Sequence, residues 1–402
     1  MCHYRGFFMN SIRFIATLGL VAFFGWAGWS LYDYFLDITA PVVTLSGIAS
    51  NAHYCGDMEC RVHADKSGLL SLTLDTTTIV HNCKLKRDQE QLFTLSTKPL
   101  SHGKHTIKIA FTDATYHKNS IVLEKDFYSD NQPLHATLIG AGVPCKVDQG
   151  RTLHIQCSVN KDIKQIYANV FSQKYQCCPE TKNGRVYECF IPIECEEQPN
   201  EYICGIDIED YVGNTLHVDA PFQVIAFPFK KEALSVTADK VQEEKALGKD
   251  GKDLEMALAA LSEQSPHEKL WRGAFCAPIE IQRVSCDFGT IRTTQHKGRY
   301  AHKAVDVINA PKSVVWAPQE GIVVMKERFA PSGNTVVIDH GLGILSLFYH
   351  LDGFADIELG QKVVQGNPIG TIGKTGFATG YHLHWEMRIN NIPVDPLQWT
   401  KL

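Results

Sequence analysis

Short runs in which apolar and polar residues alternate make up most of this chain, and turn-forming residues separate them. Residues 41–128 contain VVTLSG, LLSLTLD and HTIKIAFTD, and residues 133–227 contain HATLIG, LHIQCSV, RVYECFI and FQVIAF. A period of two places one side of each run in a core and the other in solvent, as in an antiparallel strand. The sequence therefore predicts a mainly β protein.

These two regions also resemble each other. The segment IAFTD at 109–113 is followed by Asn119, and the segment IDIED at 206–210 is followed by Asn214. A repeat of about 90 residues built from short strands fits a β-sandwich of the immunoglobulin-like type. We expect two tandem sandwich modules, which usually serve as spacers or binding platforms.

The N-terminus contains an almost unbroken apolar run at 14–31, FIATLGLVAFFGWAGWSL. Its length is close to the roughly 20 residues that a membrane helix needs. Arg5 and Arg13 precede the run, so the positive-inside rule predicts a cytoplasmic tail at 1–13 and a transmembrane anchor at 14–36. A cleaved signal peptide is a weaker alternative, since no A-x-A-like cleavage site follows the run. A buried core helix is another, disfavoured because the run is N-terminal, apolar all round and flanked by arginines.

Cysteine usage agrees with export. Of the 13 cysteines only Cys2 precedes the anchor, which leaves 12 on the exported side. An even number in an oxidising compartment favours disulfides, whose pairing the sequence does not give, although Cys276 and Cys286 form a plausible local pair. A second metal site is disfavoured because no Cys-x-x-Cys pair occurs.

Residues 230–266 change to a charged, helix-forming composition. Two helices are expected, at 238–247 and 253–263, separated by GKDGKD. Leu254, Leu258 and Leu261 share one face of the second. We interpret this segment as a helical linker whose apolar stripe packs on a neighbouring domain; an element that covers the functional site is the alternative.

From residue 270 to 402 strand patterns return, and six of the 17 histidines lie between His296 and His384. The sequence HKAVD carries His302 and Asp306, HLH carries His382 and His384, and His350 ends an apolar run in FYHL. Residues i and i+2 of a strand share a face, so both histidines of HLH face one site. Two histidines and a carboxylate meet the needs of catalytic zinc: His302, Asp306 and one histidine of HLH supply them, leaving two histidines for proton transfer.

The motifs of this region resemble, in order, those of the lysostaphin/LytM-type zinc endopeptidases. The resemblance extends over residues 275–399 and consists of CDFGTIR, HKAVD, AP–EGIVV, GNTVVIDHG, FYHL, LGQKVVQGNPIGTIGKTGFATGYHLHWEM and VDPLQW. It implies a small antiparallel β peptidase domain with a groove for an extended peptide. It also implies one zinc ion per chain, bound by His302, Asp306 and His384, with His350 and His382 as the catalytic pair of general base and oxyanion stabiliser.

Three positions depart from the family pattern. Ala304 replaces the glycine of H-x-G-x-D, Tyr381 stands where proline is common, and Phe348 stands where tyrosine is usual. His340 fits a structural turn better than a ligand. Glu386 fits two interpretations equally well: a residue that contacts a metal ligand, or a solvated strand residue. Asn334 either lines the groove or stabilises the turn after Gly333.

The sequence thus predicts a zinc-dependent endopeptidase that hydrolyses peptide cross-links of peptidoglycan, implying the D-alanyl–diaminopimelyl bond in a Gram-negative wall. We expect a single-pass inner-membrane protein with its bulk in the periplasm. Its expected partners are peptidoglycan, the lipid bilayer and envelope proteins that bind the β-modules. A net charge of −5 argues against nucleic acid. A non-catalytic envelope scaffold or activator of wall hydrolases, and a protease of protein substrates, are the alternatives.

Overall fold

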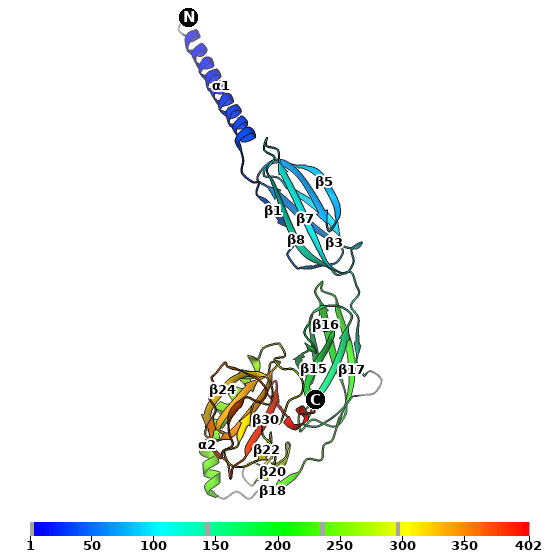
Figure 1. Cartoon of the computed structure of the whole chain (residues 1–402), viewed down its shortest axis with the longest axis vertical. Coiled ribbons are helices and arrows are strands. Elements are labelled where there is room, and N and C mark those ends of the chain that lie inside the picture. The colour runs from blue at the N-terminus through cyan, green and yellow to red at the C-terminus, as the bar shows by residue number, and fades with distance from the viewer. Residues whose placement is uncertain (1–3, 141–144, 234–237, 295–297, 402) are drawn as a thin grey trace. The chain divides into compact units, whose positions relative to one another are not determined.

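The computed structural model describes residues 4–140, 145–233, 238–294 and 298–401 (Figure 1). The chain divides into two compact units. The first contains residues 1–133 and 211–213, and the second contains residues 134–210 and 214–402. Strands dominate both, which confirms the mainly β prediction.

The first unit opens with helix α1, Tyr4–Leu36, which contains the apolar run predicted as a membrane anchor. The side chains of residues 4–16 lie outside the described part of the structure. A search of the described residues finds no helix that combines the length and the apolar character needed to cross a bilayer.

Two sheets face each other in the rest of this unit. One has the strand order β1 (Val43–Ser46), β3 (Asp57–Ala64), β6 (Glu90–Ser96), and the other β2 (His53–Tyr54), β8 (Ser120–Ser129), β7 (Gly103–Asp113), β4 (Gly68–Leu74), β5 (Thr77–Leu85). Alternate residues of β3 and β7 are buried, and they meet in a single core. Period-two burial therefore builds a β-sandwich here.

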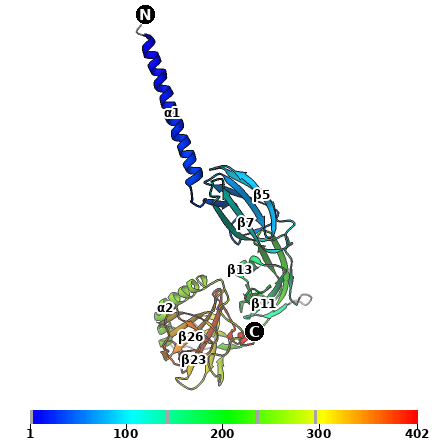
Figure 2. The ribbon, with the colours of Figure 1, turned by 45° about the horizontal axis from the view of Figure 1, so that its top comes forward.

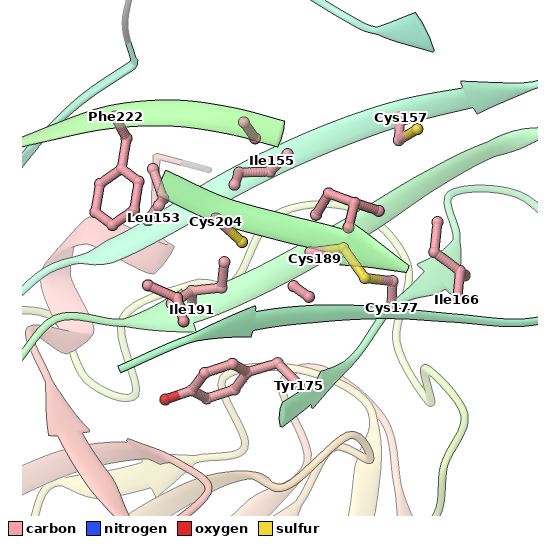
Figure 3. Close-up of a cluster of buried hydrophobic side chains, with 14 of the residues drawn as sticks. Leu153, Ile155, Cys157, Ile166, Tyr175, Cys177, Cys189, Ile191, Cys204 and Phe222 are labelled. Carbon is pink, nitrogen blue, oxygen red and sulfur yellow. A yellow bond between two sulfur atoms is a disulfide. The ribbon is translucent and has the colours of Figure 1, made fainter. Parts of the chain in front are cut away.

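A second sandwich follows in the second unit. Its five-stranded sheet has the order β10 (Cys145–Asp148), β17 (Thr215–Ile225), β16 (Glu201–Asp210), β12 (Ile163–Val170), β13 (Gln173–Gln176), and its four-stranded sheet the order β14 (Cys178–Pro179), β15 (Val186–Pro192), β11 (Thr152–Val159), β9 (Ala136–Leu138). Figure 3 shows side chains from both sheets meeting in its core.

The same core contains a disulfide between Cys177 and Cys189 (Figure 3). The other ten cysteines within the described residues are free. The local pair expected between Cys276 and Cys286 is therefore wrong. Cys286 lies on β19, and its side chain faces His302 and Asp306. Cys276 lies in a loop, where its backbone N–H donates to the carbonyl of Pro318.

Both sandwiches close one hairpin with the same device, as the repeat in the sequence suggested. Asn119 donates its backbone and side-chain N–H groups to the two carboxylate oxygens of Asp113, each at 3.0 Å. Asn214 does the same to Asp210, each at 2.8 Å. Both aspartates are buried, so the paired asparagine satisfies a carboxylate that burial would otherwise penalise.

The C-terminal domain is built on an eight-stranded sheet. Its strands run in the order β19 (Arg283–Cys286), β22 (Val305–Ile308), β30 (Leu383–Ile389), β26 (Ile344–Leu351), β25 (Gly333–Asp339), β24 (Gly321–Phe329), β28 (Lys362–Val363), and β31 (Ile392–Val394) also pairs with β30. Two three-stranded sheets flank it: β18 (Lys231–Ala233), β20 (Ile291–Thr294), β21 (Gly298–Ala301), and β23 (Val314–Trp316), β29 (Pro368–Thr371), β27 (Gly353–Phe354). The short helix α3, Pro396–Trp399, ends the fold.

Helix α2, Ala238–Glu263, is one continuous helix, so the two separate helices expected here are wrong. The GKDGKD segment contains no proline, and glycine costs only about 1 kcal/mol in a helix interior, so docking of the C-terminal half outweighs the break. Figures 1 and 2 show α2 lying along the C-terminal domain. Leu254 and Leu258 are buried there against Val337, Leu345 and Tyr349.

The second sandwich and the C-terminal domain share a core. Phe190 of the sandwich packs with Trp271 and Trp399. The indole N–H of Trp399 donates to the hydroxyl of Thr152 at 3.0 Å. This buried aromatic contact joins the two into one compact unit.

Candidate metal centre

A row of side chains crosses the main sheet on one face. Cys286 of β19 lies opposite Asp306 of β22, Asp306 lies opposite His384 of β30, and His384 lies opposite Tyr349 of β26. Residues opposite each other in antiparallel strands have neighbouring side chains on the same face. Four strands that are distant in sequence thus bring a thiol, a carboxylate, an imidazole and a phenol together.

Asp306 is the centre of the cluster. One carboxylate oxygen lies 3.3 Å from His302 Nε2. The other lies 3.0 Å from His384 Nδ1 and 3.8 Å from His382 Nε2. The alternation predicted for HLH holds: Leu383 between the two histidines is fully buried in the core of the opposite face.

The charge state follows from burial and this contact pattern. Burial alone would raise the pKa of Asp306, but hydrogen bonds from His302 and His384 lower it well below its usual range. Burial alone would lower the pKa of His384, but the Asp306 and Glu386 carboxylates raise it to about 9. The carboxylate of Asp306 is therefore ionised and favours positive charge beside it. Without a metal ion, that charge is a protonated imidazole.

The donor geometry fits a small divalent cation. Tetrahedral zinc with bonds of about 2.0–2.1 Å places its ligand atoms about 3.3 Å apart. The Asp306 oxygens lie 3.3 Å from His302 Nε2 and 3.0 Å from His384 Nδ1. His302 Nδ1 is buried without a hydrogen-bond partner of normal geometry among the described residues, although the Cys286 thiol interacts with this imidazole and raises its pKa. These two donor pairs fit the zinc site that the sequence predicts, although the three residues in the described part of the chain whose ligand atoms all lie within 4.8 Å of one another are Cys286, His302 and Asp306.

His350 stands beside these three residues. Its Nδ1–H donates to the carbonyl of Thr375 at 2.8 Å, so its Nε2 carries the lone pair in the neutral ring. Burial, followed by the neighbouring His384 and His382 rings, lowers the pKa of His350 to about 3. Its imidazole is therefore neutral at physiological pH and can accept a proton at Nε2.

His382 completes the cluster. Its Nδ1–H donates to the carbonyl of Gly380 at 2.9 Å, and its ring centroid lies 4.9 Å from that of His350. The backbone carbonyls thus fix both rings with their Nε2 atoms available to the site. The structure brings together all five residues that the sequence predicted, from β22, β26, β30, the residue just before β30 and the loop after β21.

Two further residues of the site were missed by sequence reasoning. The Cys286 sulfur lies within 4.8 Å of ligand atoms of His302 and Asp306. The Tyr349 ring stacks on His384 with 5.0 Å between ring centroids. The motif CDFGTIR contained Cys286, but nothing in its spacing pointed to the strand pairing with Asp306.

The positions that depart from the family pattern are accommodated. Ala304 is fully buried and is absent from the positive-φ residues, so its backbone does not require glycine. Phe348 packs in the core on the opposite face of the sheet, while its neighbour Tyr349 presents a phenol ring to the site.

Other predicted residues have structural contacts. His340 is fully buried, donates from Nδ1 to the Glu320 carbonyl at 2.6 Å and accepts from the Ser346 hydroxyl at 2.9 Å. Asn334 donates to the carbonyls of Leu351 and Asp352. Glu386 is 2% exposed and lies 3.8 Å from His384 Nε2, so it is an outer partner of the site.

The C-terminal part of the chain is similar to known proteins. Residues 300–396 match the family described as Peptidase family M23. The chain is 36% identical over 121 residues to the DD-carboxypeptidase/endopeptidase Mpg of Neisseria meningitidis, a match that covers 30% of this chain and 27% of that protein. It is 33% identical over 121 residues to the peptidoglycan DD-endopeptidase ShyC of Vibrio cholerae, covering 30% and 28%.

Among solved structures, lysostaphin from Staphylococcus simulans is similar at 26% identity and a TM-score of 0.24, covering 25% of this chain and 44% of that chain. The chain thus spans little more than a quarter of the length of the curated relatives it matches.

Proposed function

We propose that this chain, which carries a peptidase family M23 domain at residues 300–396, is a zinc-dependent endopeptidase that hydrolyses peptide cross-links of peptidoglycan. The observation that carries the proposal is the cluster of four histidines around the ionised carboxylate of Asp306. The substrate class comes from the relatives, which include proteins named peptidoglycan DD-endopeptidases.

His302, Asp306 and His384 would bind one zinc ion. When bound, zinc lowers the pKa of a coordinated water towards about 7 and polarises a carbonyl group. The Asp306 carboxylate would offset part of the charge of the ion, and three protein ligands would leave a position open for water or substrate.

The two catalytic histidines would have different roles, one as general base and the other as stabiliser of the oxyanion. His350 is neutral, and its free Nε2 accepts a proton from the attacking water while Nδ1–H stays on the Thr375 carbonyl. His382, once protonated, donates from Nε2 to the oxyanion of the tetrahedral intermediate while Nδ1–H stays on Gly380. The sequence left this assignment open; we assign the base role to His350 because burial lowers its pKa and keeps its imidazole neutral, with Nε2 available to accept a proton.

Release of peptides from purified sacculi tests the activity. The full chain should release cross-link cleavage products that mass spectrometry identifies, and it should contain about one zinc ion per chain. His302→Ala should lose both. Zinc retained without peptide release would favour the non-catalytic scaffold, and cleavage of protein substrates alone would favour a protease of another class.

A membrane anchor at 14–36 remains part of this proposal. Large apolar side chains along the described part of α1 are exposed, among them Val21, Phe24, Trp26 and Trp29 at 66–68%. Apolar surface of this extent is usually covered by lipid or protein. An alkaline carbonate wash of cell membranes tests it: the full chain should stay with the membrane, whereas a chain without residues 1–36 should be released.

A further inference from the structure

A line of charged side chains connects α2 with His384. Glu386 lies 3.8 Å from His384 Nε2 through one carboxylate oxygen. Its other oxygen accepts from Arg388 Nε at 2.6 Å. The two terminal nitrogens of Arg388 donate to the two carboxylate oxygens of Glu255 on α2, at 2.7 and 3.0 Å.

The middle of this line is inaccessible to water. Glu386 and Arg388 are 2% and 1% exposed. A buried arginine keeps its charge. Its planar guanidinium group has N–H donors that point in fixed directions, and each of them needs an acceptor. Glu386 occupies the Nε edge and Glu255 occupies the terminal edge, so the guanidinium plane is held from both sides.

Docking of the helix sets the position of Glu255. Its neighbours Leu254 and Leu258 are buried in the same cluster as Tyr349, and the Tyr349 ring stacks on His384. The helix therefore reaches His384 by two routes, one through charge and one through packing. Neither route needs the helix to lie over the substrate.

We propose that α2 is a positioning element of the metal centre: Glu255, acting through Arg388 and Glu386, holds the His384 ring with Nδ1 directed at the site. A carboxylate on the Nε2 side favours a proton on Nε2 and leaves the lone pair on Nδ1, the nitrogen that lies 3.0 Å from Asp306. This inference rests on the proposed function, because it takes zinc as the ion that His384 binds. Glu255 is a positioning residue and touches no reacting atom.

Glu255→Gln in the full chain tests this role, because it removes the charge and keeps the length of the side chain. Loss of a residue that contacts a metal ligand typically weakens metal binding by about 10- to 100-fold. Glu255 acts on His384 only through Arg388 and Glu386, so we expect zinc binding to weaken by about tenfold, the lower end of that range. Competition with a chromophoric chelator measures this without reference to activity. The absorption spectrum of the cobalt-substituted protein should change as well, because the His384 ring is less well oriented. On sacculi, kcat should fall with little change in KM.

Two variants on the same helix separate positioning from stability. Glu263→Gln removes an equal charge from an exposed position and should leave zinc affinity unchanged. Leu258→Ala creates a cavity under the helix and should lower the melting temperature of the zinc-free protein more than Glu255→Gln does. The proposal requires the opposite order for zinc affinity: Glu255→Gln should bind zinc more weakly than Leu258→Ala does.

Zinc affinity of Glu255→Gln equal to that of Glu263→Gln would overturn the inference, and so would a loss that follows melting temperature across all three variants. A wild-type chain that takes up no zinc would overturn it too. A chain that binds zinc and releases no peptides would refute the proposed function alone, because the affinity order would still decide the role of Glu255.

Discussion

His350 adopts a backbone conformation that few side chains take. Its φ is +62°, in the left-handed region, at a cost of about 1–3 kcal/mol for a residue other than glycine. Its backbone N–H donates to Ser332 and its ring donates to Thr375, so surrounding contacts hold the strained residue in place. Strain of this kind is maintained where a side chain must point in a fixed direction.

The role of His350 can be separated from metal binding. His350→Gln removes the basic Nε2 and should lower kcat on sacculi by about 10²- to 10⁴-fold, because general base catalysis contributes about that much. Zinc content should stay at the wild-type value. His267→Gln, at an exposed position of the same compact unit, should change neither quantity. Loss of zinc from His350→Gln would instead identify His350 as a ligand.

His340 should make stability depend on pH. Burial lowers its pKa to about 4 in the folded chain, against a usual value of about 6.5. Between those values the unfolded chain binds a proton that the folded chain does not, so stability falls as pH falls through this window, by about 2 kcal/mol at about pH 5. Urea unfolding at about pH 7 and pH 5 measures it. In His340→Asn the loss on acidification should be smaller, and an unchanged loss would contradict the assignment.

At the scale of elements, period-two alternation was a reliable guide and helix boundaries were not. In the first sandwich β3 and β7 bury every second residue, because one face of each sheet packs on the other sheet. In α2 the glycines suggested a break, but the apolar stripe of Leu254, Leu258 and Leu261 docks on the sheet and the helix continues. Local propensity is weak compared with tertiary burial.

The disulfide between Cys177 and Cys189 should stabilise the second sandwich. It joins residues 12 apart, and closing a loop of about this size stabilises a fold by about 3 kcal/mol, mainly by restricting the unfolded chain. Replacing both cysteines with serine should lower the free energy of unfolding by about this amount in urea. Wild-type protein treated with reductant serves as the comparison, and should match the double variant. Equal stability of oxidised wild type and variant would contradict a formed bond.

At the scale of the whole molecule, we expect the second sandwich and the C-terminal domain to depend on each other for stability. Trp399 is 1% exposed between Phe190 and Thr152 of the sandwich and Phe275 of the domain. Trp399→Ala should cost about 3–5 kcal/mol, as truncation of a buried aromatic residue does. It should also separate the unfolding of the two parts, which we expect to melt in one transition in the wild type.

Calorimetry distinguishes these outcomes, with Trp316→Ala as the matched control. Trp316 lies in the same domain and is 38% exposed, so its loss should cost much less. Separate transitions for the second sandwich and the C-terminal domain in the wild type, in addition to that of the first unit, would show that the shared core does not couple them.

The sequence alone determined which residues could form the site. The HLH spacing fixes two histidines on one strand face, because a strand has a period of two. The motif order placed His302, Asp306 and His350 in the same domain, and their assigned roles stay predictions until zinc and kinetics are measured. Alternation likewise fixed the mainly β class, because a pattern of burial is already present in the order of residues.

Only the tertiary structure decided what surrounds these residues. Cys286 meets Asp306 because β19 pairs with β22, and Glu255 meets Arg388 because α2 docks on the face that carries the site. The pairing of Cys177 with Cys189, and not of Cys276 with Cys286, depends on the same kind of contact. Such contacts join segments far apart in the chain, and their geometry depends on how sheets and helices pack, which no local pattern of residues contains.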